Sequence, residues 1–255
     1  NGVDLWFWGV GREGLAIDGS YENVVVGNAF LNNSAGSIFL YKNCGEYPDR
    51  PRYFERRHHA DDNLIEGNTF AGGRNGVWVG SRMAENTLPM DCTDPAYVEG
   101  PLTRIVRDHA AGNVVRGNRF VEVTYGVRVE DDRTVVEGNT FEGSHPALHP
   151  VIVGTPYRTD VLGEPVTGTV LVDNVSTVAG NPSPYRWIHG HEDTTVAGNT
   201  ALGAAAPFCE GEETPRQVMI FVIAAAPMGP DGTPPDPPAD LSVPVVGELP
   251  PCAAT

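Results

Sequence analysis

The chain is poor in lysine and in basic residues generally. Lys and Arg total 17 against 33 Asp and Glu, which gives a formal net charge of −16. So acidic a chain is not expected to bind nucleic acid non-specifically, because it would be repelled by the phosphate backbone. Long apolar runs are also missing. The run at 218–226 is far shorter than the roughly 20 residues of a membrane-spanning helix, so we expect no membrane span.

Cysteine is scarce, and no two cysteines form the Cys-x-x-Cys pair of a zinc ribbon. Cys44 and Cys92 fall in inserted stretches, whereas Cys209 and Cys252 flank the C-terminal tail. We predict disulfides 44–92 and 209–252, and therefore a secreted or extracellular protein, because such bonds persist in oxidising compartments. The start at Asn1 rather than Met fits a processed, exported product. The alternative is a cytosolic protein with free thiols.

Glycine (30) and proline (22) are abundant, as is typical of turn-rich β proteins and unlike helical bundles. One pattern recurs along the chain: Asn, a short run rich in β-branched residues, a Gly-Asn step, and Phe two residues later. A repeat of this kind predicts a solenoid. Clear copies cover 23–30, 63–70, 113–120 and 135–141, and weaker ones end at 173–174 and 198–199.

The distances between Gly-Asn steps indicate the length of each coil. The step from Asn118 to Asn139 suits a bare coil of short strands, whereas those from Asn28 to Asn68 and from Asn68 to Asn118 are about twice as long and predict inserted loops. Gly accepts left-handed backbone, and Asn tolerates it better than most residues; Asn side chains can also hydrogen-bond along the axis. We predict an axial row of Asn28, Asn68, Asn118, Asn139, Asn174 and Asn199, and a stacked row of Phe30, Phe70, Phe120 and Phe141 inside.

A second strand follows each Gly-Asn step, and its alternation predicts which side chains point inward. The inward pairs are Leu15/Ile17, Ile38/Leu40, Val77/Val79 and Val127/Val129. The residues between them form outward columns across the coils. These columns are Ala16, Phe39, Trp78, Arg128; Asp18, Tyr41, Gly80, Glu130; and Gly19, Lys42, Ser81, Asp131.

The outward columns place aromatic, basic and acidic groups side by side. Exposed Phe39 and Trp78 on a flat sheet would suit the stacking of sugar rings. The alternative is that the long loops fold over this face and cover it.

The repeats resemble the right-handed parallel β-helix superfamily of secreted carbohydrate-active proteins, which includes pectate-lyase-like enzymes, alginate lyases of the chondroitinase-B type and mannuronan C5-epimerases. The resemblance covers roughly 14–201 and rests on the coil pattern, since 107–109 does not match an Asp-Pro-His-Asp epimerase motif. We therefore predict an all-β, right-handed single-stranded parallel β-helix with long loop insertions. Its coils would span 1–203, and 204–255 would form a capping segment and an irregular Pro-rich tail.

In that superfamily the ligand lies along an exposed parallel sheet between loop walls. Here the walls would be 44–62 and 82–112. The first wall gathers positive charge that a carboxylated or sulfated sugar would favour, so the resemblance implies an acidic polysaccharide as partner. The basic residues of this wall are Arg50, Arg52, Arg56, Arg57, His58 and His59.

The resemblance implies a lyase or a C5-epimerase, which both remove the proton at C5 of a uronate. That step needs a cation to neutralise the sugar carboxylate and a base to take the proton. The candidate bases are Lys42, Tyr41, His58 and His59, and the candidate neutralisers are Arg82 and Arg128. The candidate substrate-binding residues are Phe39, Trp78, Arg56, Arg57 and Glu130.

Other functions remain open from the sequence. Glu130, Asp131 and Asp132 are consecutive acids that could provide the paired carboxylates of a glycoside hydrolase. A non-catalytic polysaccharide-binding or structural β-helix is the remaining alternative. We expect no cofactor, apart from a surface calcium site that Asp61, Asp62 and Asp131 leave open.

Overall fold

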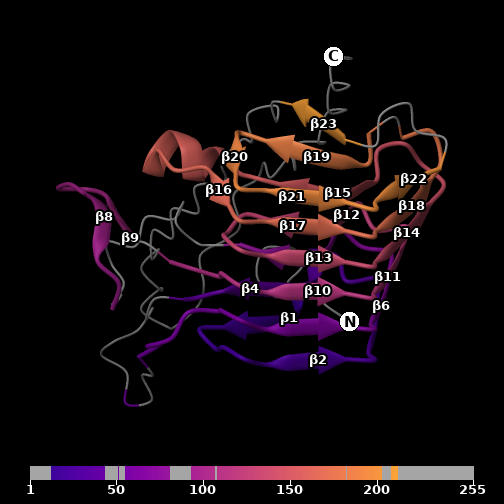
Figure 1. Cartoon of the computed structure of the whole chain (residues 1–255). Coiled ribbons are helices and arrows are strands. Elements are labelled where there is room, and N and C mark those ends of the chain that lie inside the picture. The colour runs from indigo at the N-terminus through magenta and orange to yellow at the C-terminus, as the bar shows by residue number, and fades with distance from the viewer. Residues whose placement is uncertain are drawn as a thin grey trace, which may run out of the picture.

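The computed structural model describes residues 13–43, 51, 55–80, 93–106, 108–181, 183–202 and 208–211. Short strands stack as parallel neighbours in three long sheets, which Figure 1 shows as layers along one axis. We name these three sheets A, B and C. In every coil the chain adds one strand to each of them, in the order B, C, A. The predicted right-handed parallel β-helix is confirmed.

Each long sheet takes one strand from every coil. Sheet A contains β1 (Glu13–Asp18), β4 (Gly36–Tyr41), β7 (Asn75–Val79), β12 (Tyr125–Val129), β15 (His149–Val153), β19 (Tyr185–Ile188) and β23 (Phe208–Gly211). Sheet B contains β2 (Val24–Val26), β5 (Leu64–Glu66), β10 (Val114–Arg116), β13 (Val135–Glu137), β17 (Val170–Val172) and β21 (Thr195–Ala197). Sheet C contains β3 (Ala29–Leu31), β6 (Thr69–Ala71), β11 (Arg119–Val121), β14 (Thr140–Gly143), β18 (Val175–Val178) and β22 (Thr200–Ala201).

The core lies between the three sheets, and alternation along sheet A fills it as predicted. Ile38 and Leu40 of β4 are fully buried, as are Val77 and Val79 of β7. Because side chains of a strand alternate between its faces, the residues between these pairs point away from the core. Strand β23 pairs with β19, so sheet A continues beyond residue 203.

Two rows of asparagines, which are buried in the middle coils, join successive coils. In the main row the backbone N–H of each Asn donates to Oδ1 of the Asn in the next coil, at 2.8–3.0 Å. The predicted axial row is confirmed from Asn28 to Asn199. A second row joins Asn23 to Asn63 and Asn63 to Asn113, each at 2.9 Å.

Phenylalanines stack beside the asparagines. Phe30, Phe70, Phe120 and Phe141 lie with neighbouring ring centroids 4.6–5.1 Å apart and nearly parallel, as predicted. The glycine of the Gly-Asn step takes the left-handed backbone, with φ of 59° at Gly117 and 60° at Gly138. The asparagine is therefore needed for the hydrogen bonds of its side chain rather than for a tolerance of left-handed backbone.

The insertions occur where the long steps predicted them, between β4 and β5 and between β7 and β10. The second insertion carries an antiparallel pair, β8 (Ala96–Glu99) and β9 (Arg104–Val106), which stands away from the coils in Figure 1. A milder insertion after β15 holds a π-helix, η1 (Tyr157–Leu162), and β16 (Val166–Thr167), which pairs with β20 (His191–Glu192).

The predicted disulfides stay predictions. Cys44, Cys92 and Cys252 lie outside the described residues, and Cys209 lies in β23 with a side chain that is not described. Most of the predicted tail at 204–255 also lies outside them.

Replacing Asn118 with Ala tests the asparagine row. Oδ1 of Asn118 accepts the backbone N–H of Asn68, and its Nδ2 donates to Ile65 O and to Asn139 Oδ1. All of these groups are buried, so Asn118→Ala should lower the free energy of unfolding by about 2–5 kcal/mol, the cost of leaving buried polar groups unpaired. Urea unfolding measures the loss. Arg119→Ala, at the exposed neighbouring position, is the control; an equal loss in both variants would contradict the role of the row.

Candidate functional site

The outward column of sheet A forms the predicted mixed face. Register pairs Phe39 with Trp78 and Trp78 with Arg128, as predicted. The Phe39 and Trp78 rings meet edge to face with centroids 4.9 Å apart, and both side chains are partly exposed. The Arg128 guanidinium lies 5.5 Å from the centroids of both the Trp78 and the Tyr125 ring, which is cation–π distance.

The Trp78 indole lies over Gly80. A Cβ added at Gly80 would come within 2.4 Å of Trp78 Nε1, so any larger residue there would displace the ring. Nε1 is buried and has no hydrogen-bond partner within the described part of the chain. Buried donors are normally paired, and residues 81–92, which directly follow Gly80 in the chain, lie outside the described ranges.

The rest of the face is less open than the exposed-platform interpretation requires. Tyr41, Lys42, Arg128 and Glu130 are all buried. The Tyr41 hydroxyl donates to Glu13 Oε1 at 2.6 Å, and Arg128 pairs with Glu130. The interpretation of an exposed platform is therefore wrong for these side chains and holds for Phe39 and Trp78.

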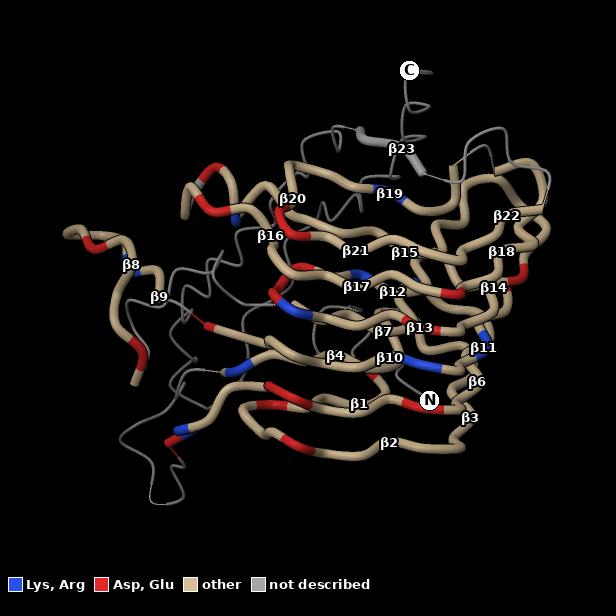
Figure 2. The backbone as a smooth tube through the Cα atoms, in the orientation of Figure 1, with Lys and Arg blue, Asp and Glu red and all other residues tan. Residues whose placement is uncertain are grey.

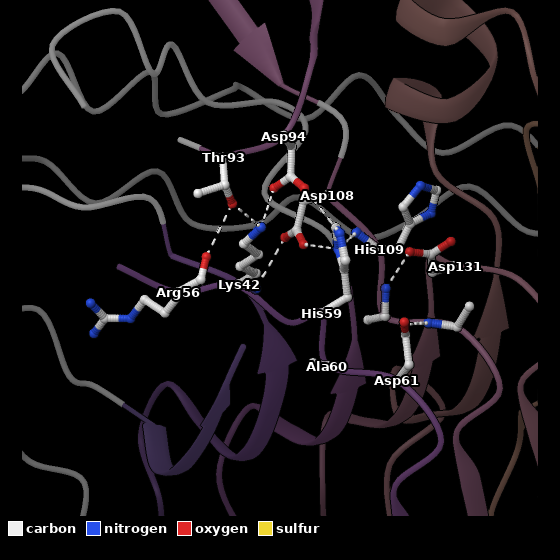
Figure 3. Close-up of polar contacts among 12 residues, drawn as sticks. Lys42, Arg56, His59, Ala60, Asp61, Thr93, Asp94, Asp108, His109 and Asp131 are labelled. Atoms are coloured by element: carbon white, nitrogen blue, oxygen red, sulfur yellow. Dashed lines mark hydrogen bonds and ion pairs between the residues drawn. The ribbon is translucent and has the colours of Figure 1, made fainter. Parts of the chain in front are cut away.

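A compact ionic cluster lies where the insertions meet sheet A (Figure 3). Lys42, the only lysine of the chain, donates from Nζ to Asp94 Oδ2 at 2.5 Å and to Thr93 Oγ1 at 2.9 Å. His59 lies between two carboxylates, with Nε2 3.0 Å from Asp94 Oδ1 and Nδ1 3.4 Å from Asp108 Oδ1. Asp108 Oδ2 also accepts the backbone N–H of Lys42 at 3.1 Å.

The members of this cluster come from both insertions. Lys42 directly follows β4, and His59 precedes β5. Asp94 precedes β8 and Asp108 follows β9, so they bracket the projecting hairpin. The cluster therefore fixes the base of the hairpin to the end of sheet A.

The two carboxylates control the protonation of His59. Hydrogen bonds with Asp108 and Asp94 raise its pKa to about 9, although burial opposes them. The backbone N–H of His109 also opposes protonation, because it donates to Nδ1 at 2.9 Å and needs a lone pair there. Burial by itself raises the pKa of Asp94, but hydrogen bonds from His59 and Lys42 outweigh it and leave that pKa lowered.

Exposure separates the candidate bases. The side chain of Lys42 is 2% exposed and held by Asp94, whereas that of His59 is 23% exposed. His58 is exposed and contacts the Tyr21 ring at 4.9 Å. His59 is thus the predicted base that combines partial exposure with flanking carboxylates.

The predicted acids are bound by arginines. Arg158 donates to Asp131 at 2.7 Å and to Asp132 at 2.8 Å, and Glu130 is paired with Arg128. Burial raises the pKa of Asp131 to about 6, against the effect of Arg158. These consecutive acids therefore do not form the open carboxylate pair of a hydrolase.

The calcium site left open by the sequence gains no support either. Asp61 accepts the backbone N–H of Ala111, and Asp131 accepts that of Ala110. In the part of the chain that the structure describes, no group of His, Cys, Asp and Glu is arranged to hold a metal ion.

Two more predicted arginines, Arg56 and Arg57, are each paired with an acid. Arg56 pairs with Asp18 at 3.0 Å, and Arg57 pairs with Glu55 at 2.7 Å in an exposed position. Arg82 lies outside the described residues. Figure 2 shows Lys and Arg positions scattered among Asp and Glu positions over the coils, without one large basic face.

Replacing His59 with Gln tests the ionic cluster through pH. A raised pKa means that the contribution of His59 to stability is complete below its ordinary value of 6.5 and is lost as the pH rises through about 9. His59→Gln should therefore be destabilised relative to the parent at pH 6, and the difference should shrink by about 1–3 kcal/mol by pH 9.5.

Urea unfolding across this pH range measures the difference, with His58→Gln as the matched exposed control. A gap between the parent and His59→Gln that stays constant with pH would contradict the assigned cluster.

Comparison with known proteins gives one family. A family model described as "Periplasmic copper-binding protein (NosD)" matches residues 10–203, which is more than half of the chain. No curated protein and no solved structure matches the chain. None of the helices among the described residues is long and apolar enough to cross a membrane.

Proposed function

The chain belongs to the NosD family, and we propose that it is an exported β-helix that binds an acidic polysaccharide along the outward face of sheet A. The family is described as periplasmic, which supports an exported protein. The Phe39–Trp78 pair supports the proposal most directly, because both aromatic side chains are partly exposed and lie on adjacent strands.

The repeat geometry suits an extended ligand. Neighbouring strands of a sheet lie about 4.8 Å apart, so a sugar chain parallel to the axis would meet an equivalent outward position at every coil. Phe39 and Trp78 offer apolar ring surfaces on adjacent strands, on which sugar rings can stack.

The charge of the face supports an anionic sugar over a neutral one. The chain carries a net charge of −16, yet the outward column holds Arg128 and, further along, Arg186. Arg128 is paired with Glu130, so Arg186 supplies the positive charge that would attract a carboxylated or sulfated ligand to this column.

Copper, which the family description names, does not fit the described residues. The His59 and His109 rings lie 5.2 Å apart, but Nε2 of His59 is bonded to Asp94 and its Nδ1 accepts the N–H of His109. Since no group of metal ligands is arranged in the described ranges, the proposed function uses no metal.

A second candidate is enzymatic, and the partly exposed His59 favours it. In a lyase or an epimerase a base takes the C5 proton of a uronate. Because the pKa of His59 is raised to about 9, His59 would serve as that base only in alkaline solution, where it is neutral. Lys42 and Tyr41 are less suited, because each is buried and bonded within the chain. A rise in ultraviolet absorbance on uronate polymers would identify a lyase; new reducing ends without it would identify a hydrolase.

Replacing Trp78 with Ala tests the binding function. Loss of the stacking surface and of Nε1 should weaken binding of an oligogalacturonate roughly threefold to tenfold, the range expected for one aromatic contact. Isothermal titration calorimetry measures the affinity, and the melting temperature of each variant shows that it remains folded.

Tyr21→Ala is the control, because Tyr21 is an exposed aromatic between β1 and β2 and lies off the outward column. If Trp78→Ala binds every acidic polysaccharide of a panel as tightly as the parent, the proposed face is wrong.

A further inference from the structure

Arg186 of β19 is a half-buried arginine that has no ion pair with any acid in the described part of the chain. It continues the outward column, because register pairs Arg128 with Ile152 and Ile152 with Arg186. Its Nε donates to the Ser183 carbonyl at 3.3 Å, and no carboxylate pairs with it among the described residues. Burial lowers the pKa of Arg186, and the nearby Tyr125 only partly opposes this.

In this respect Arg186 differs from the buried arginines of the described residues, Arg128 and Arg158. Arg128 pairs with Glu130, Arg158 with Asp131, and even the exposed Arg119 pairs with Glu142. The chain has about twice as many acids as bases, so an arginine without an acid is not explained by a shortage of carboxylates. Removing a guanidinium from water without a counter-ion is unfavourable, so a bound anion would stabilise it.

A second buried group beside Arg186 also lacks a partner. His149 of β15 is 4% exposed, and its Nδ1 has no hydrogen bond within the described ranges. Burial and then the charge of Arg186 lower the pKa of His149 to about 3, so the imidazole is neutral at physiological pH. The Tyr125 ring stacks on it with centroids 5.5 Å apart.

These groups lie on the outer side of sheet A and not in the core. Tyr125, Ile152 and Ile188 form a small apolar cluster that is separate from the main core, and Ile152 is the register neighbour of Arg186. Tyr185 and Trp187, which flank Arg186 in sequence, are buried on the inner side. Arg186 therefore combines a positive charge with an apolar surrounding that strengthens it.

We propose that Arg186, with His149 and Tyr125 beside it, forms an anion subsite for the carboxylate or sulfate group of an acidic sugar. The subsite rests on the proposed function and deepens it, since it lies in the same column as Phe39 and Trp78 and would fix where along the axis a charged sugar unit sits. The bound oxyanion would accept hydrogen bonds from the Arg186 guanidinium and supply the missing counter-charge.

Titration of the parent, Arg186→Leu and Arg186→Lys with three probes tests the subsite. The probes are an oligogalacturonate, the same oligosaccharide with its carboxylates methyl-esterified, and a chondroitin sulfate oligosaccharide. Arg186→Leu should bind the charged probes roughly tenfold to a hundredfold more weakly, the range for a charge-assisted hydrogen bond, and Arg186→Lys should recover part of the loss. The esterified probe should not distinguish the three proteins.

Stability provides a readout that a merely structural arginine would not give. Without ligand, Arg186→Leu should melt at or above the temperature of the parent, because the variant loses a partly buried charge that has no counter-ion among the described residues. Arg119→Ala, which removes an exposed and paired arginine on sheet C, is the control for overall charge and should bind all probes like the parent.

The outcomes separate the subsite from the proposed function. Equal binding of the charged probes by the parent and Arg186→Leu, or a lower melting temperature of Arg186→Leu, overturns the subsite and leaves the proposed function standing. If no oligosaccharide binds, the melting temperatures of the parent and of Arg186→Leu are measured with and without inorganic sulfate. A sulfate-induced rise in the melting temperature of the parent alone supports the anion subsite and overturns the polysaccharide function, whereas no rise overturns both.

Discussion

The fold depends on the hydrogen bond between the backbone N–H of one coil's asparagine and the carboxamide of the next. This bond recurs from Asn28 to Asn199, is largely buried, and lets only one register satisfy both groups. Once the corner between sheets B and C is fixed in this way, the phenylalanine stack and the inward pairs of sheet A follow. The same register aligns the outward column, so the proposed binding face is a consequence of a structural device.

The insertions are positioned by charge. Lys42, His59, Asp94 and Asp108 satisfy one another at the end of sheet A, and Arg158 joins the later insertion to Asp131. Lys42 and Asp131 are buried in these ion pairs, so the pairs hold the loops in place and do not contact a ligand. Phe39 and Trp78 remain partly exposed, and no acid pairs with Arg186 in the part of the chain that the structure describes. A binding function therefore follows more directly from the structure than a catalytic one.

The coils were predictable from sequence because their rules are local. Each coil is marked by a Gly-Asn step, by a Phe two residues later and by strands with alternating side chains. These features depend only on neighbours in the chain, and the predicted rows of asparagines and phenylalanines are present. The cluster was not predictable in the same way, because His59 and Asp94 come from different insertions and meet only in three dimensions. Arg186 and His149 were not predicted. The earlier strands of sheet A have a glycine at their first or second position, whereas β15 and β19 do not, so the sequence pattern did not extend the outward column beyond Arg128.

In the proposed complex an acidic sugar chain lies along the outward face of sheet A, with a ring on Trp78 and a charged group on Arg186. A crystal structure of the protein with a bound uronate oligosaccharide would test this placement. We expect the oligosaccharide to lie roughly parallel to the solenoid axis, crossing β7, β12, β15 and β19, with an oxyanion within hydrogen-bond distance of the Arg186 guanidinium. A ligand bound on sheet B, on sheet C or on the β8–β9 hairpin would contradict it.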